Sequence, residues 1–393
     1  MDIYKEALDI EDILISLRRD FHMHPELGFE EHRTSGKIKE FLDSLNIPYE
    51  SYAGTGVCGI ITGEKKSDKT RVIALRADID ALPMQEKNTC EYKSLNEGRM
   101  HACGHDAHTT ILLGAAKLLN DHKSEFSGIV KLIFEPAEET TGGAPVMIKE
   151  GVLENPHVDA IIGLHVDESM EYGNIKIKYG VVNAASNPFT IKIKGKGGHG
   201  AQPHTTVDPI VIASQVVLSL QTIVSREITP VNPSLTTIGS IQGGTAQNII
   251  PDEVCLKGII RTMTKEDREY AKKRLREVVN GICVTMRAEA DIEIEESYPC
   301  LYNEDSMVDV VKTAACSEIG EEHVLNQKNP KMGVESFAYF AEQRDSAFYF
   351  LGIANKEKNI IHPLHNSLFD IDERALAVGV AIQTKAVLDY LTK

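Results

Sequence analysis

Residues 129–139 read IVKLIFEPAEE, a short apolar run followed directly by two adjacent glutamates. The run predicts a buried strand over Ile129–Phe134. Similar runs lie at Val72–Ala77 and Ala160–Leu164, and helical patterns at Asp106–Leu119 and Gly143–Glu150. Strands that alternate with helices predict an α/β fold, in which a mostly parallel sheet is covered by helices on both faces.

The pattern changes from about Asn187, where strand, helix, strand, strand, helix and strand follow one another. This βαββαβ order is that of a ferredoxin-like unit. The predicted elements are Phe189–Lys194, Val207–Ser225, Leu235–Ile241, Val254–Arg261, Lys265–Arg287 and Ile292–Tyr298. After Cys300 the helix–strand alternation resumes. We therefore expect one discontinuous α/β domain, residues 1–184 and 297–393, interrupted by a smaller inserted domain, residues 185–296.

Composition and charge narrow the classes of function. The 393 residues are 42% hydrophobic and 25% charged, which is ordinary for a soluble globular protein of two or three domains. The net charge of −16 disfavours binding to nucleic acid and to anionic membranes. No apolar run approaches the ~18 residues of a membrane span, and the acidic N-terminus does not read as a signal peptide. Seven scattered cysteines argue against a disulfide framework and favour a reducing cytoplasm.

Potential metal ligands gather in MHACGHDAH, residues 100–108. Gly104 interrupts regular structure, and we expect Asp106 to be the N-cap of the following helix. Cys103 and His105 could then point from a loop into one cavity. A Cys-x-His pair is weak evidence alone, so a site needs partners elsewhere. The potential ligands of this segment are His101, Cys103, His105, Asp106 and His108.

Further ligand-type side chains follow the predicted strands. In open α/β sheets, ligands bind outside the carboxyl ends of the strands, so we expect these side chains to converge at one sheet edge. Their mixture of thiol, imidazole and carboxylate groups suits Zn²⁺ or Mn²⁺ and not Ca²⁺ or Mg²⁺. The side chains are Asp78 and Asp80 after the first strand, Glu138 and Glu139 after the second, His165 after the third, and His365 near the C-terminus.

Seven motifs in this order resemble one family, the dinuclear-metal amidohydrolases and peptidases. That family includes aminoacylase, hippurate hydrolase, auxin-conjugate hydrolases and acyl-diaminopimelate deacylases. The resemblance runs nearly end to end and is greatest to the bacterial N-acyl-amino-acid amidohydrolase branch. It implies a metal-binding catalytic domain and an inserted lid and dimerisation domain. The motifs are HPELGFEE (24–31), LRADIDALPMQE (75–86), MHACGHDAH (100–108), FEPAEE (134–139), GLHV (163–166), GGHGAQPH (197–204) and LHNSLFDID (364–372).

The resemblance implies two divalent transition-metal ions per subunit, Mn²⁺ or Zn²⁺, with Co²⁺ and Ni²⁺ as further candidates. Glu138 would be the general base that accepts a proton from a metal-activated water. Asp80 would orient a metal ligand. Many relatives have a His ligand where this chain has Asp78, which we do not count as a ligand. The implied metal ligands are Cys103, His105, Glu139, His165 and His365.

Three residues of the inserted domain also match the family. His199 would donate a hydrogen bond to the oxyanion of the tetrahedral intermediate. Asn248 and Arg261 would hold the α-carboxylate of the substrate. Taken alone, the three residues read as a polar loop histidine, a turn asparagine and a surface arginine. In several relatives the equivalent histidine comes from the partner subunit, so the resemblance implies a homodimer.

One motif departs from the family pattern. Relatives often have Gly-x-Glu-Asp-Phe where this chain has Gly333-Val334-Glu335-Ser336-Phe337, which leaves open how this segment shapes the substrate pocket. His22 and His24, in RRDFHMHPELGFEE, are expected to be structural.

The predicted function is metal-dependent hydrolysis of the amide bond of N-acyl-L-amino acids, with acetyl, benzoyl or related acyl groups. The products are a carboxylate and a free amino acid. Two alternatives stay open: a metallo-dipeptidase or carboxypeptidase of the same family, and a metal-binding member that has lost catalysis. The intact Glu138–Glu139 pair argues against the second.

Overall fold

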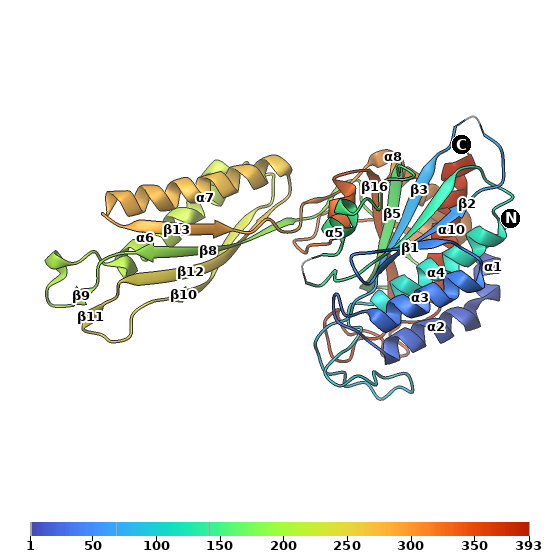
Figure 1. Cartoon of the computed structure of the whole chain (residues 1–393), viewed down its shortest axis with the longest axis horizontal. Coiled ribbons are helices and arrows are strands. Elements are labelled where there is room, and N and C mark those ends of the chain that lie inside the picture. Colours follow the sequence, from blue (N-terminus) through green and yellow to red (C-terminus); the bar gives the residue numbers. More distant parts are fainter. Residues whose placement is uncertain (1, 68, 141, 393) are drawn as a thin grey trace. The chain divides into compact units, whose positions relative to one another are not determined.

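The computed structural model describes residues 2–67, 69–140 and 142–392. The chain divides into two compact units (Figure 1). Unit 1 comprises Met1–Val182, Tyr302–Asn329 and Ser336–Lys393, and unit 2 comprises Asn183–Leu301 and Pro330–Glu335. The short second segment of unit 2 was not anticipated from the sequence.

Unit 1 is built on an eight-stranded sheet of order β1-β2-β4-β3-β5-β16-β6-β15. The central pairs β4–β3, β3–β5 and β5–β16 are parallel, whereas β1–β2, β2–β4 and β16–β6 are antiparallel. The predicted mostly parallel sheet is therefore confirmed. The strands are β1 (Tyr49–Tyr52), β2 (Gly56–Thr62), β3 (Val72–Asp78), β4 (Ile129–Glu135), β5 (Ala160–Glu171), β6 (Ile175–Ile177), β15 (Val324–Asn326) and β16 (Asp345–Ala354).

Helices cover both faces of this sheet. On one face α4 and α10 form a continuous apolar core with α1, α2, α3 and α8 (Figure 1). On the other face α9 packs directly on β5, because Gly163 has no side chain and a Cβ there would lie 2.8 Å from the ring of Phe337. The helices are α1 (Ile3–Asp9), α2 (Glu11–Met23), α3 (His32–Ser44), α4 (His105–Asp121), α5 (Ala144–Lys149), α8 (Asp305–Ile319), α9 (Phe337–Ala341) and α10 (Ala375–Thr392).

Strand β5 extends further than the sequence predicts. It was expected to end at Leu164, before His165, but it continues to Glu171. Strand β3 pairs with it only as far as Gly163, while β16 continues beside it and pairs Phe350 with His165. His165 therefore lies within a strand, next to the point where β3 ends.

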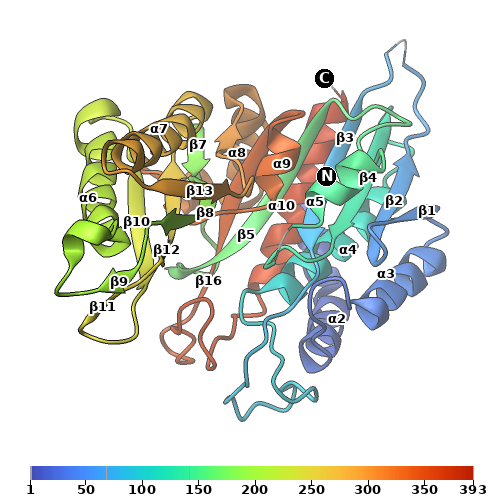
Figure 2. The same cartoon turned by 60° about the vertical axis from the view of Figure 1, so that its left-hand side comes forward.

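Unit 2 has a four-stranded antiparallel sheet of order β10-β12-β8-β13, with α6 and α7 packed on one face (Figure 2). This confirms the predicted ferredoxin-like unit, although its last strand ends at Ile294 and not near Tyr298. The elements are β8 (Ala185–Lys194), α6 (Pro209–Thr222), β10 (Leu235–Gln242), β12 (Glu253–Thr262), α7 (Lys265–Thr285) and β13 (Glu289–Ile294), with the short strands β9 (Gly198–His199) and β11 (Ile249–Ile250).

Two helical segments, Pro209–Glu227 and Ala375–Thr392, are long and apolar enough to cross a membrane by length and composition alone. This corrects the expectation that no segment approaches that length. Ala375–Thr392 is mostly buried against α4 and α8, which is the environment of a core helix. Pro209–Glu227 is one-third buried and packs on α7 and the sheet of unit 2.

Candidate metal centre

The carboxyl ends of β3 and β4 meet the start of α4 and the middle of β5 at one edge of the unit 1 sheet. All five predicted ligands lie there, together with Glu138. Within each of three groups the possible ligand atoms lie within 4.8 Å of one another. The groups are Cys103–His105–His165, Cys103–Glu139–His365 and His105–Glu138–Glu139.

Gly104 determines how Cys103 and His105 are presented. Helix α4 begins at His105, and Gly104 is its N-cap with a φ of 82°, a left-handed conformation that glycine adopts at little cost. A Cβ on Gly104 would lie 2.5 Å from the side chain of Val166. Glycine therefore allows the Cys103–His105 loop to approach β5 next to His165.

Asp106 is not the N-cap that we predicted, because α4 begins at His105 and its N-cap is Gly104, two residues earlier. Its buried carboxylate instead accepts hydrogen bonds from Arg18 Nε at 2.9 Å and from His22 Nδ1 at 2.7 Å. His22 Nε2 lies 3.3 Å from Glu86. Burial and Arg18 act to lower the pKa of His22, but the carboxylates of Asp106 and Glu86 outweigh them and raise it. This cluster fixes α2 against the first turn of α4.

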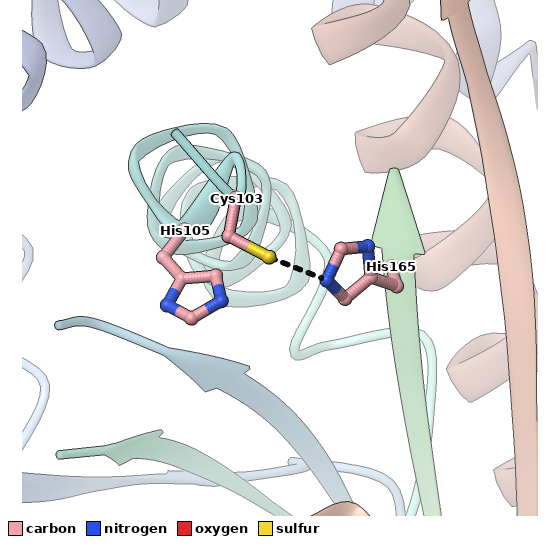
Figure 3. A group of neighbouring side chains, drawn as sticks. All are labelled: Cys103, His105 and His165. Atoms are coloured by element: carbon pink, nitrogen blue, oxygen red, sulfur yellow. Dashed lines mark hydrogen bonds between the residues drawn. The ribbon is translucent and has the colours of Figure 1, made fainter. Parts of the chain in front are cut away.

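Cys103 lies at the centre of the ligand cluster. Its Sγ is 3.4 Å from His165 Nε2, the contact marked by the dashed line in Figure 3, and 3.3 Å from His365 Nε2. Glu139 Oε1 is 3.2 Å from His365 Nε2 and 3.9 Å from His105 Nε2. Thiol, imidazole and carboxylate groups from four separate parts of the chain thus face one small volume.

The hydrogen bonds of two histidines leave a nitrogen available for a metal. His105 Nδ1 donates to the carbonyl oxygen of Asp80 at 2.9 Å, and its buried Nε2 has no hydrogen-bond partner among the described residues. His165 Nδ1 donates to the carbonyl oxygen of Val166 at 2.8 Å, so its Nε2 faces Cys103 with a lone pair. Burial lowers the pKa of His165 to about 4 and keeps the ring neutral. A buried polar atom without a partner is unfavourable, and a transition-metal ion would satisfy it.

Asp80 connects two of the possible ligands. Its Oδ1 lies 3.3 Å from His105 Nδ1, and its Oδ2 accepts a hydrogen bond from the backbone N–H of Glu139 at 3.0 Å. A carboxylate in this position can orient both residues without binding a metal itself.

Asp78 is already occupied by other partners. Its Oδ1 accepts from His108 Nδ1 at 2.6 Å, and its Oδ2 accepts from Arg76 Nη1 at 2.7 Å. His108 Nε2 in turn accepts the backbone N–H of Val166 at 3.0 Å. Burial would raise the pKa of Asp78, but His105, His108 and Arg76 outweigh it and hold the pKa well below its usual value. Although Asp78, His105 and His108 also lie close together, Asp78 and His108 satisfy each other.

A strained turn presents the two glutamates. Ala137 precedes them with a φ of 56°, which is unusual for a residue other than glycine. Its N–H donates to Glu31 Oε1 at 2.8 Å, and Glu31 Oε2 accepts from the Thr55 hydroxyl at 2.6 Å. The buried Glu31 thus holds the turn that carries Glu138 and Glu139. The motif HPELGFEE contains this residue, but its sequence alone gave no sign of the role.

His199 and Asn248 are neighbours at one end of unit 2. Both are exposed, and β9 pairs with β11 so that Gly200 N–H donates to the carbonyl oxygen of Asn248 at 2.8 Å. The N–H of Ala201 donates to His199 Nδ1 at 3.0 Å. The neutral ring therefore carries its hydrogen on Nε2, which can act as a donor.

Arg261 lies elsewhere in unit 2. It lies near the C-terminal end of β12, where the pairing of this strand with β10 ends. Strand β12 has ten residues and begins shortly after β11 in the chain. Such a strand spans about 30 Å. Its Nη1 donates to the carbonyl oxygen of Met332 at 3.2 Å, in the short second segment of unit 2. A single copy of unit 2 therefore does not bring Arg261 together with His199 and Asn248.

Sequence comparisons agree with this architecture. The family model described as peptidase family M20/M25/M40 matches residues 74–389. IAA-amino acid hydrolase ILR1-like 4 of Arabidopsis thaliana is 39% identical, over 98% of this chain and 87% of its own length. Thermostable carboxypeptidase 1 of Saccharolobus solfataricus is 37% identical, over 99% and 98%. N-acetyl-L-cysteine deacetylase of Bacillus subtilis is 39% identical, over 93% and 85%.

Solved structures give the same result. A putative aminohydrolase from methicillin resistant Staphylococcus aureus superposes with a TM-score of 0.93 at 36% identity, over 100% of both chains. The YxeP protein of Bacillus subtilis, described as a dinuclear metal binding peptidase from the M20 family, has a TM-score of 0.84 at 33% identity, over 98% of this chain and 99% of its own.

Proposed function

This chain belongs to peptidase family M20/M25/M40 and is a hydrolase that acts on amide bonds, and from that premise we propose that it cleaves N-acyl-L-amino acids to a carboxylate and a free amino acid. The observation that carries the proposal is the convergence of one thiol, three imidazoles and two adjacent glutamates at one sheet edge. The names of two relatives, an IAA-amino acid hydrolase and an N-acetyl-L-cysteine deacetylase, support an acylated amino acid as the substrate class.

Two divalent transition-metal ions fit the site, Mn²⁺ or Zn²⁺, with Co²⁺ and Ni²⁺ as further candidates. Their ligands would be Cys103, His105, Glu139, His165 and His365. When bound, such ions polarise the scissile carbonyl and lower the pKa of water toward ~7. Burial, with the charge of Glu139, raises the pKa of the Cys103 thiol well above its usual value. Metal binding would therefore release a proton from Cys103.

Three acidic residues around this site have different roles in the proposed reaction. Glu138 accepts a proton from the attacking water and delivers it to the leaving nitrogen. Glu139 is instead directed toward His365 and His105. Asp80 orients His105 and the backbone of Glu139 through its two carboxylate oxygens.

We assign substrate recognition to unit 2, as a lid and dimerisation domain. His199 would donate its Nε2 hydrogen to the oxyanion, while Asn248 and Arg261 would bind the α-carboxylate. Because β12 separates Arg261 from His199 and Asn248 by about 30 Å, one small substrate would contact both groups only if they came from different subunits. This separation supports a homodimer. Among the described residues no cysteine forms a disulfide bond, which supports a reducing cytoplasm as its compartment.

The carboxypeptidase relative favours one alternative, hydrolysis of peptides at the C-terminus. Amine release from a panel of N-acyl-L-amino acids and dipeptides distinguishes the two, using protein stripped of metal and reloaded with Mn²⁺ or Zn²⁺. We expect metal-dependent release from the acylated substrates. Release from dipeptides alone would favour the peptidase, and no release from any substrate with either metal would contradict the proposed function.

A further inference from the structure

We propose that Ser336 is a positioning residue, which holds the Glu138 carboxylate in place for proton transfer and is itself held by Arg76. This inference rests on the proposed function, in which Glu138 is the general base. It also gives a role to the motif that departs from the family pattern, Gly333–Phe337, where Ser336 stands at the position that is often Asp in relatives.

The backbone N–H and the hydroxyl of Ser336 both make hydrogen bonds that bear on Glu138. Its backbone N–H donates to Glu138 Oε1 at 3.0 Å, across 198 positions of sequence. Its hydroxyl oxygen accepts a hydrogen bond from Arg76 Nη2 at 2.6 Å. Ser336 is 0% exposed, so no bulk water competes for either contact. The side chain of this residue fixes the position from which its own backbone holds Glu138.

Arg76 is a rigid anchor for this arrangement. The guanidinium donates from Nη1 to Asp78 Oδ2 at 2.7 Å and from Nε to Glu135 Oε2 at 2.6 Å. Arg76, Asp78 and Glu135 are all fully buried. Asp78 ends β3 and Glu135 ends β4, only three positions before Glu138. One guanidinium thus ties together both strand ends and the residue that contacts the base.

Helix capping does not account for the serine. Ser336 is the N-cap of α9, where a serine hydroxyl usually accepts a hydrogen bond from the first turn of the helix. Here the side chain makes no such bond, and its oxygen faces Arg76 instead. A neutral hydroxyl accepts from Arg76 without adding a third carboxylate beside Asp78 and Glu135, close to Glu138.

The test compares Ser336→Ala, which removes the acceptor, with Ser336→Thr, which keeps a hydroxyl. We expect Ser336→Ala to lower kcat about tenfold or more, since small displacements of a catalytic group are costly. The KM should stay within about threefold and the metal content should equal that of the wild type. Ser336→Thr should recover most of the kcat.

Ser346→Ala is the matched control. Ser346 is also buried, and its hydroxyl donates to the carbonyl oxygen of Tyr302 at 3.1 Å, at the start of β16. The Ser346→Ala variant should have a lowered melting temperature, as Ser336→Ala should, but its kcat should be unchanged. A merely structural role for Ser336 predicts equal kcat values in the two variants, and that result would overturn the proposal. The proposal would also be overturned if Ser336→Ala lost activity because it bound less metal or because its KM rose.

Crystal structures of the metal-loaded wild type and Ser336→Ala supply a readout that does not depend on turnover. We expect the Glu138 carboxylate to move out of hydrogen-bond distance of the backbone N–H of residue 336 in the variant. An unmoved carboxylate would contradict the positioning role. Wild-type protein that released no amine from any substrate would instead contradict the proposed function, while this structural comparison would still decide the role of Ser336.

Discussion

The candidate residues of the two units are held in different ways. In unit 1, Cys103, His105 and Glu138 are less than one-tenth exposed, and distant elements of the chain fix their surroundings. In unit 2, His199 and Asn248 are exposed and are held mainly by local backbone contacts. Under the proposed function, the buried groups of unit 1 would be in place before substrate arrives, whereas the exposed groups of unit 2 would act only on a substrate that reaches them. Substitutions of Glu138 and His199 should then lower kcat to different extents, whereas substitution of Arg261 should mainly raise KM.

The largest effect should come from Glu138→Gln in unit 1. The amide keeps the shape of the side chain but cannot accept the proton, so we expect kcat to fall about a thousandfold. Because Glu139 and the histidines are unchanged, the metal content should match that of the wild type, as measured by elemental analysis alongside amine release. Activity within tenfold of the wild type would refute the assignment of the base.

His199→Ala tests whether the unit 2 residues act across subunits. Removing one oxyanion donor should lower kcat by about a hundredfold or more. If His199 acts in the partner's site, a mixed dimer of Glu138→Gln and His199→Ala contains one site with both residues intact. Co-refolding equal amounts of the two variants should then restore about a quarter of wild-type activity, since half of the dimers are mixed. No recovery, with mixed dimers demonstrated, would place His199 in its own subunit's site.

Arg261→Ala should change a different kinetic constant. Arg261 would contact the α-carboxylate in both the ground state and the transition state, so its loss should raise KM about tenfold and lower kcat less. Arg261→Lys keeps the charge and loses the bidentate geometry, so its KM should lie between those of the wild type and Arg261→Ala. Steady-state kinetics on one N-acyl amino acid and on its amide, which lacks the carboxylate, measures the difference. An equal KM in Arg261→Ala and the wild type would contradict the assignment.

Some features of the structure could be predicted from the sequence more readily than others. The parallel sheet and the ferredoxin-like unit were predictable, because buried strands and amphipathic helices have local patterns with periods of 2 and 3.6 residues. The possible metal ligands were predictable because several stand beside strand ends, and the family resemblance singled out five of them. These features are encoded within short segments such as residues 100–108 and 129–139.

The connections that support the site could not be predicted in this way. The Arg76–Ser336 contact joins residues 260 positions apart, and the Glu31–Ala137 contact joins residues 106 apart. Such pairs exist only once the sheet has formed. The error at Asp106 has the same origin, since its carboxylate serves Arg18 and His22 and not the end of its own helix.

The smallest predicted effect lies in the framework of unit 1, away from the site. His122, the C-cap of α4, places Nε2 2.6 Å from Glu6 and Nδ1 3.3 Å from Glu125. Burial acts to lower the pKa of His122, but hydrogen bonds to Glu6 and Glu125 outweigh it and raise the pKa. A raised pKa means that the folded state binds the proton more tightly than the unfolded state. The stabilisation is therefore complete below the unfolded value of ~6.5 and is lost as pH rises through the folded value.

His122→Ala should therefore lower the stability of the folded protein only at acidic pH. The ion pair is partly exposed, so we expect a contribution of about 0.5 kcal/mol, or roughly 1–2 °C in melting temperature, at pH 5.5. At pH 8.5 wild type and variant should melt nearly together, and kcat should be unchanged at both pH values. His157→Ala is the matched control, because His157 also contacts a glutamate, Glu154 at 2.9 Å, but is much more exposed. A difference that grew with rising pH would mean that His122 stabilises unit 1 in its neutral form, by packing and not by charge.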